Sequence, residues 1–125
     1  MHVVRPDEVR EFGAGGHAIA GLVAPSRGAR ELTLLQARLA PGASTPAHQH
    51  DREELLVLAS GVLEVCCGDD VWRVLPGEVA ILPPGVDHEM TNVGHEEAVM
   101  LLFSGAGARS FDRNGREMPT PPWLE

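Results

Sequence analysis

Three histidines and one glutamate lie at spacings that could assemble a metal site: His48, His50, Glu54 and His88. His48 and His50 are separated by one residue, so an extended chain would point both imidazoles to the same face. Glu54 keeps this parity if the segment stays extended, although a local turn could alter it. His88 comes much later and could fold back beside the others through intervening strands. Three imidazoles and a carboxylate form a mixed N/O donor set that suits a borderline divalent metal.

The open coordination positions of such a site would matter for function. Four protein ligands in an octahedral shell leave two positions for water or substrate, which distinguishes a reactive metal from a structural one. A His-x-His pair alone is a weak indication, because any single histidine could be a surface residue. We expect His2, His17 and His95 to be surface residues. Glu53 could compete with Glu54 as the carboxylate ligand, but the spacing favours Glu54.

Short apolar segments separated by glycine and proline turns make up most of the chain. Residues 17–104 show no sustained helical periodicity, and Gly68-Asp69-Asp70 indicates a hairpin turn. This pattern predicts an all-β fold, an antiparallel barrel or jelly roll, with its core barrel at about 17–104. The expected strands are 17–24, 32–39, 54–59, 62–66, 71–75, 79–82, 88–93 and 98–103.

The two ends of the chain differ from this core. Residues 1–16 are polar and are predicted to form an N-terminal arm, with one helical turn beginning near Pro6. The tail 110–125 is rich in proline, so its 118–123 stretch should be extended. We expect it to lie along the body of the protein or of a partner subunit, with disorder as the alternative. The length of 125 residues favours a single domain, 1–125.

Two longer patterns surround the candidate ligands. The first runs from Gly42 to Gly61 with the spacing G-x5-HxH-x3-E-x6-G. The second runs from Gly77 to Asn92 with the spacing G-x5-PxG-x2-H-x3-N. Both are complete, and together they resemble the two motifs of the cupin family. The resemblance implies a double-stranded β-helix, a small jelly-roll barrel with a metal inside its mouth. It also implies that the metal ligands are His48, His50, Glu54 and His88.

The walls of such a barrel can be predicted from strand parity. Leu56 and Leu58 share the face of Glu54, and Met90 shares the face of His88, so the pocket should have an apolar lining. Gln36 and Arg38 share one face of the 32–39 strand. If that face points inward, Arg38 could hold a carboxylate or enolate substrate. If it points outward, Arg38 is an ordinary surface charge, and the register of the strand cannot be read from one sequence.

Charge and composition disfavour several classes of function. The net charge is −8 without a basic stripe, which argues against nucleic acid or an anionic membrane as a partner. All ten basic residues are arginine, which excludes a lysine Schiff base. Neither a signal peptide nor an apolar run of ~20 residues is visible, so we expect a cytoplasmic protein. Cys66 and Cys67 are adjacent, point to opposite faces of a strand, and should stay reduced.

A bound metal would have to supply most of any chemistry, because no Ser/His/Asp or Cys/His triad is evident. The first hypothesis is a metal-dependent enzyme for a small, largely apolar organic substrate, of the dioxygenase, decarboxylase, isomerase or polyketide-cyclase type. The alternatives are a non-catalytic small-molecule-binding or sensor protein and a purely structural metal site. The donor set suits Fe, Mn, Co, Ni, Cu or Zn. A homodimer is expected, because a small barrel tends to cover its exposed edge strand, with the arm and the tail as natural contacts.

Overall fold

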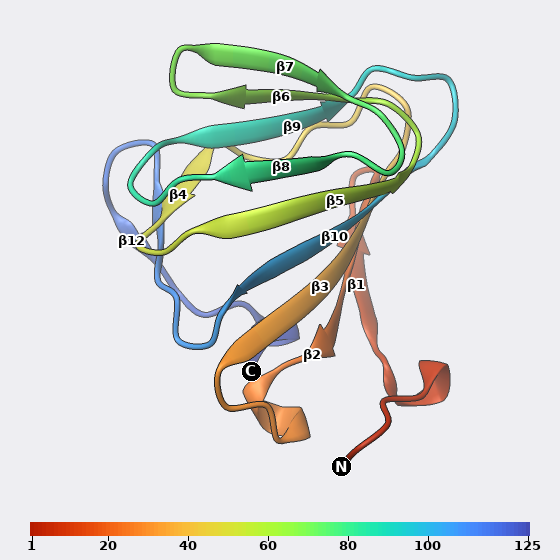
Figure 1. The fold of residues 1–125 in the computed structure, drawn as a ribbon, viewed down its shortest axis with the longest axis vertical. Helices are drawn as coiled ribbons and strands as arrows, with labels where there is room; N and C mark the ends of the chain where they lie inside the picture. Colours follow the sequence, from red (N-terminus) through yellow and green to blue (C-terminus); the bar gives the residue numbers. More distant parts are fainter.

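The computed structural model describes residues 1–125, except for the side chain of Ala14. Regular structure is almost entirely β-strand, with three short 3-10 turns and no α-helix among the described residues (Figure 1). The strands are β1 (Glu11–Ala14), β2 (His17–Val23), β3 (Leu32–Leu39), β4 (His48–His50), β5 (Glu54–Ser60), β6 (Leu63–Cys67), β7 (Asp70–Val74), β8 (Val79–Leu82), β9 (His88–Asn92), β10 (Ala98–Gly105), β11 (Ser110–Asp112) and β12 (Glu117–Met118). The 3-10 turns are η1 (Pro6–Glu8), η2 (Pro25–Arg27) and η3 (Pro122–Leu124).

The strands form two antiparallel six-stranded sheets. Sheet A has the order β1-β2-β3-β10-β5-β8, and sheet B has the order β12-β11-β4-β9-β6-β7. Neighbours in each sheet come from distant parts of the sequence, as in β3 beside β10 and β4 beside β9, so the chain winds repeatedly from one sheet to the other (Figure 1). The predicted all-β jelly roll is therefore confirmed. None of the described helical turns has the length and apolar character needed to span a membrane.

Cross-strand register determines which side chains face the interior. Leu102 of β10 lies opposite Leu35 of β3 and Leu56 of β5. Directly opposite residues share one face of a sheet, and all three are buried in the same apolar core. Met90 of β9 joins this core from sheet B. The interior between the two sheets is therefore lined by apolar side chains from both.

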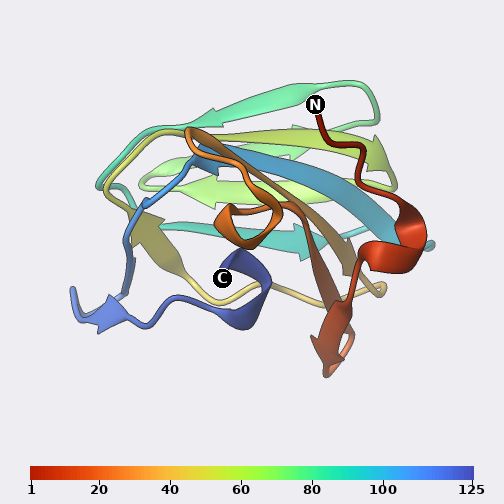
Figure 2. The ribbon, with the colours of Figure 1, turned by 90° about the horizontal axis from the view of Figure 1, so that it is seen from below.

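Both ends of the chain fold against its own body. β1 pairs with β2, which extends sheet A, and the predicted turn at Pro6 is η1. The tail adds β11 and β12 to sheet B, and its last residues form η3. Trp123 and Leu124 of η3 pack against the core, and Figure 2 shows this C-terminal turn among the strands. The expectation that the tail lies along the body is confirmed, although 122–124 form a 3-10 turn rather than a fully extended segment.

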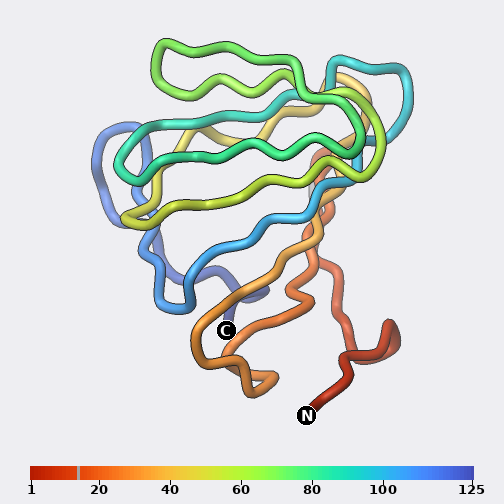
Figure 3. The backbone as a smooth tube through the Cα atoms, viewed as in Figure 1, coloured from red at the N-terminus to blue at the C-terminus, as the bar shows by residue number. Residues whose placement is uncertain are grey.

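The hairpin of β6 and β7 turns at Gly68, as Gly68-Asp69-Asp70 predicts. Figure 3 shows this hairpin at one end of the molecule and both termini well away from it. Cys66 and Cys67 lie on β6 as free thiols, and burial is the main cause that raises the pKa of Cys67. A raised pKa keeps this thiol protonated at neutral pH.

Candidate metal centre

Three strands bring the predicted ligands together. His48 and His50 are the first and last residues of β4, and His48 lies directly opposite His88 at the start of β9. Gly85 has a φ of 74°, a conformation that glycine adopts without strain, and its turn leads into β9. Glu54 begins β5 and faces the histidines from sheet A. The site therefore lies between the two sheets.

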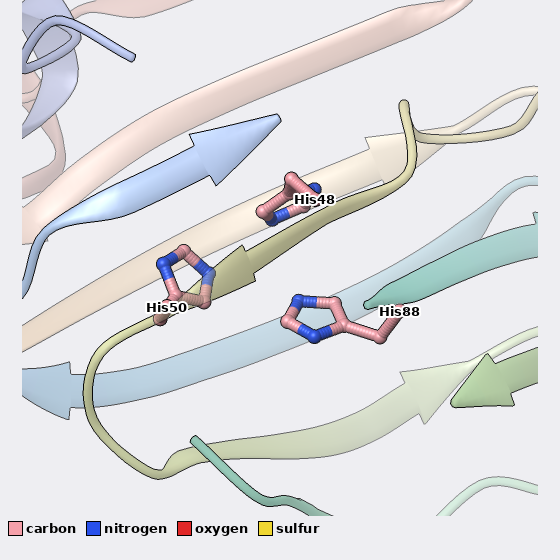
Figure 4. A group of neighbouring side chains, drawn as sticks. All are labelled: His48, His50 and His88. Carbon is pink, nitrogen blue, oxygen red and sulfur yellow. The ribbon is translucent and has the colours of Figure 1, made fainter. Parts of the chain in front are cut away.

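The distances within this group are short. His48, His50 and His88 each offer a ring nitrogen, and these three atoms all lie within 4.8 Å of one another (Figure 4). One Glu54 carboxylate oxygen lies 3.3 Å from Nε2 of His50, and the other lies 3.6 Å from Nε2 of His88. In Figure 4 the three imidazoles, from β4 and β9, point toward a common space. All four predicted ligand residues thus meet at one place.

Burial controls the protonation of this group. Desolvation lowers the pKa of His50 to about 4, with a further lowering by the neighbouring His48. Desolvation, His48 and His50 together lower the pKa of His88 to about 4. Burial raises the pKa of Glu54 to about 7. At neutral pH both buried imidazoles are therefore uncharged, and an uncharged imidazole has a lone pair for a metal.

The residues present fit a divalent metal ion. Nε2 of His50, Nε2 of His88 and Oε1 of Glu54 are buried without a hydrogen-bond partner. Unpartnered buried polar atoms are costly, and a cluster of them facing one another is explained by an ion that they would share. Three imidazole nitrogens with a carboxylate oxygen match the preferences of first-row transition metals.

Neighbouring groups orient two of the imidazoles. Nδ1 of His48 lies 2.7 Å from the carbonyl oxygen of Pro46, to which it donates a hydrogen bond, leaving Nε2 free. Nδ1 of His50 lies 2.8 Å from the hydroxyl of Ser110, which β11 places directly opposite it. Such outer hydrogen bonds fix ring orientation in metal sites. The sequence patterns did not indicate Ser110, because it lies outside both motifs.

A second hydroxyl missed by the sequence patterns faces the same interior. Ser104 of β10 lies directly opposite Glu54, and its Oγ is buried without a partner. Thr33 of β3 lies beside Ser104 and donates a 3.3 Å hydrogen bond to its carbonyl oxygen. A polar row therefore crosses sheet A next to the candidate centre, and the hydroxyl of Ser104 in this row has no hydrogen-bond partner. Only cross-strand register could have revealed this row.

The residues predicted to line the pocket lie in the apolar core beside the candidate centre. Leu56 and Leu58 follow Glu54 on the inward face of β5, and both side chains are fully buried. Met90 follows His88 on the inward face of β9 and is also buried. The surroundings of the candidate centre are therefore mainly hydrocarbon.

Gln36 and Arg38 lie on the other side of β3, which corrects the expectation that they could contact a substrate. Arg38 is exposed and lies 3.6 Å from Glu11 and 3.8 Å from Glu97. The inward positions of β3 are instead taken by alternate residues such as Ala37 and Leu39. The register with β10 sets this face, and the sequence could not decide it because Leu34 and Leu35 are both apolar.

Asn92, in the second motif, has a structural role. Its side-chain amide donates to the carbonyl oxygens of Leu39 and Glu96 and accepts from the backbone N–H of Gly94. These bonds join the end of β9 to β3 and to the loop before β10.

Known proteins resemble this chain over most of its length. The family model described as "Cupin domain" matches residues 35–104. Germin-like protein subfamily 1 member 7 of Arabidopsis thaliana is 34% identical over 88 residues, which cover 63% of this chain and 38% of that protein. The chain spans less than half the length of the curated relatives it matches.

Solved structures share the fold at lower identity. The polyketide cyclase RemF from Streptomyces resistomycificus has a TM-score of 0.76 and 21% identity, covering 98% of this chain and 88% of that one. The oxalate decarboxylase of Lactobacillus farciminis, in a formate complex, has a TM-score of 0.77 and 16% identity, covering 86% of this chain and 34% of that one. With two facing antiparallel sheets and a family match over more than half of its residues, this chain belongs to the cupin family.

Proposed function

We propose that this chain is a metal-dependent enzyme for a small, largely apolar organic substrate. One observation carries the proposal: buried, unpartnered nitrogens of His50 and His88 face the Glu54 carboxylate inside an apolar interior. An arrangement of this kind is costly in a purely structural core. It is explained by a metal that these side chains and His48 hold.

Different residues of the site would have different roles in this function. The three histidines and Glu54 would hold the ion, and Ser110 and the Pro46 carbonyl would keep His50 and His48 in position. A divalent metal there would supply Lewis-acid chemistry or activate oxygen or water. Leu56, Leu58 and Met90 would exclude water from the substrate. The free hydroxyl of Ser104 would orient a substrate oxygen.

Among the possible reaction types, cyclisation of an aromatic polyketide has the best support. The buried polar residues of the described structure are Thr33, Glu54, His88 and Asn92, with no arginine among them. Apart from the metal itself, a small dianion such as oxalate would thus find no buried cationic side chain to balance its charge, which disfavours it relative to a neutral substrate. A neutral polyketone suits hydrocarbon walls with a few hydroxyls. The likeness in fold to a polyketide cyclase over 98% of this chain supports the same choice.

Metal binding is the first test. Protein purified without a nickel column should contain about one transition-metal ion per chain by elemental analysis. His50→Ala should weaken rebinding of Zn(II) or Mn(II) at least ~10-fold, because it removes one ligand. His95→Ala is the matched control, since His95 is exposed and outside the cluster. Equal metal content in wild type and His50→Ala would refute this centre.

Turnover is the second test. The metal-loaded protein should convert an aromatic poly-β-ketone analogue, and it should leave oxalate unchanged. His50→Ala should abolish the conversion, while His95→Ala should retain it. Consumption of oxalate with no reaction of the polyketone would overturn the proposed substrate class.

A non-catalytic binding protein is the second candidate. It is favoured by the scarcity of acid and base groups, since the buried polar residues beyond the proposed ligands are, within the described part of the chain, Thr33 and Asn92. It predicts that an apolar ligand binds the metal-loaded protein and raises its melting temperature without being changed. Tight binding without turnover across a panel of polyketones and phenols would favour this candidate over the enzyme.

A further inference from the structure

Trp72 is an aromatic side chain on the inner face of its sheet that is nevertheless open to solvent. On β7 it lies directly opposite Val65 of β6, and directly opposite residues share one face of a sheet. Val65 is buried in the apolar core between the two sheets, whereas Trp72 is 71% exposed. The interior of the barrel therefore has an opening beside Trp72.

This opening is a groove between the edges of the two sheets. β7 is the last strand of sheet B and β8 is the last strand of sheet A, and residues of both strands line the groove. Its volume is about 660 Å³, which lies in the range of ~300–1,000 Å³ typical of small-molecule sites. We name it the edge groove, and its mainly apolar inner wall is formed by Val65, Cys67, Trp72, Val74, Ala80 and Leu82.

The strand register connects the edge groove to the candidate metal centre. Cys67 lies directly opposite His88, and Leu82 lies directly opposite Glu54, so two residues of the inner wall are neighbours of proposed ligands. Neighbouring strands lie ~4.8 Å apart and two residues of a strand span ~6.8 Å, which places Trp72 on the order of 12 Å from His88. A molecule of several fused rings can span this distance, with one end at the metal and the other at Trp72.

The charges around the edge groove favour a neutral ligand. Three acidic residues line it, Asp69, Asp70 and Glu78, against one arginine, Arg73. Arg73 also lies opposite Glu64 of β6, which offsets its charge. An anionic ligand would meet a net negative charge here, whereas a neutral aromatic ligand would meet hydrocarbon and the face of an indole ring.

We infer that the edge groove binds the aromatic end of a neutral substrate and that Trp72, by stacking on its rings, selects aromatic over aliphatic substrates. The inference rests on the proposed function and assigns Trp72 a role in binding, not in the chemical step. Stacked aromatic rings gain free energy beyond that of the buried area alone. The outer edges of β7 and β8 also present backbone N–H groups that can donate to ketone oxygens of the substrate.

Calorimetric binding of naphthol to the metal-loaded protein is the first test. Trp72→Leu should weaken binding about 10-fold, because it keeps an apolar side chain but removes the ring, and Trp72→Phe should stay within about 3-fold of wild type. Val71→Leu is the matched control, since Val71 is 61% exposed on the same strand and points to the opposite face. Decahydronaphthol, the saturated counterpart, should bind wild type about 5-fold more weakly than naphthol does.

Substrate kinetics separate this inference from the proposed function. Trp72→Leu should raise the KM for the polyketone analogue about 10-fold and leave kcat within about 3-fold, as expected when binding is lost without a change in the chemical step. If Trp72→Leu and Val71→Leu bind naphthol equally, or if wild type does not bind it, the inference is wrong even where the polyketone is converted. If naphthol binding depends on Trp72 but the polyketone is not converted, the inference holds and the proposed enzyme activity is wrong. Circular dichroism verifies that the variants remain folded, as expected for substitutions of exposed side chains.

Discussion

Glu54 is the buried carboxylate that faces His50 and His88, and burial raises its pKa to about 7. The ordinary pKa of a glutamate carboxyl is 4.5, so the folded chain holds this proton more tightly than the unfolded chain does. Its contribution to stability is therefore present below pH 4.5 and is lost as the pH rises through 7. In metal-free protein above pH 7, Glu54→Gln should raise the melting temperature by roughly 5 °C.

The same substitution should have the opposite effect in the presence of metal. Loss of the carboxylate should weaken Zn(II) or Mn(II) binding, so saturating metal should stabilise Glu54→Gln less than wild type. Glu53→Gln is the matched control, because the adjacent Glu53 is exposed. Thermal melts at pH 6, 7 and 8, with and without metal, measure both effects. Equal responses of the two variants would show that Glu54 is not the carboxylate of the centre.

The residues that the sequence identified were those with fixed local spacing. His48, His50, Glu54 and His88 lie in compact motifs, and the fold brings them together. Ser104 and Ser110 were not indicated, because they reach the centre only through pairing with β5 and β4. Their contribution depends on register between distant strands, which no local pattern contains.

The strand β11 supports the centre from the tail. It pairs with β4 and places the Ser110 hydroxyl 2.8 Å from Nδ1 of His50. Ser110→Ala should weaken metal binding about 10-fold, as expected when a hydrogen bond that orients a ligand is lost. Ser44→Ala is the control, because Ser44 bonds the Thr91 hydroxyl rather than a proposed ligand. Competition with a chromophoric chelator measures the metal affinities of the two variants. Equal affinities would show that β11 does not support the centre.

Elements with strong apolar patterns were predicted well, and short ones were not. The expected strands 32–39 and 79–82 agree with β3 and β8 at both ends. β1, β4, β11 and β12 were not among the expected strands, since two to four residues show no periodicity and form strands only when a neighbour supplies hydrogen bonds. The outward placement of Arg38 could not be predicted either, because the pairing of β3 with β10 determines which face of β3 each side chain occupies.

At the scale of the whole molecule, the C-terminal turn closes one open side of the interior. Trp123 and Leu124 pack against the core, and the Trp123 ring centroid lies 6.1 Å from that of Phe12. The Trp123 carbonyl oxygen occupies the space where a Cβ on Gly21 would lie. Gly21 does not have a positive φ, so alanine there is opposed by this collision alone. Gly21→Ala should therefore displace the tail and lower the melting temperature by roughly 5 °C.

Gly94→Ala provides the comparison, because its added Cβ would meet its nearest atoms at 3.4–3.5 Å, which is ordinary contact. In a Trp72→Phe background Trp123 is the remaining tryptophan, and its emission should shift to the red in Gly21→Ala and not in Gly94→Ala. Identical spectra and melting temperatures would show that the tail does not close the interior. If Gly21→Ala also speeds metal exchange, the tail limits access to the centre. The last residues of the chain would then act on the same site as the motifs in its middle.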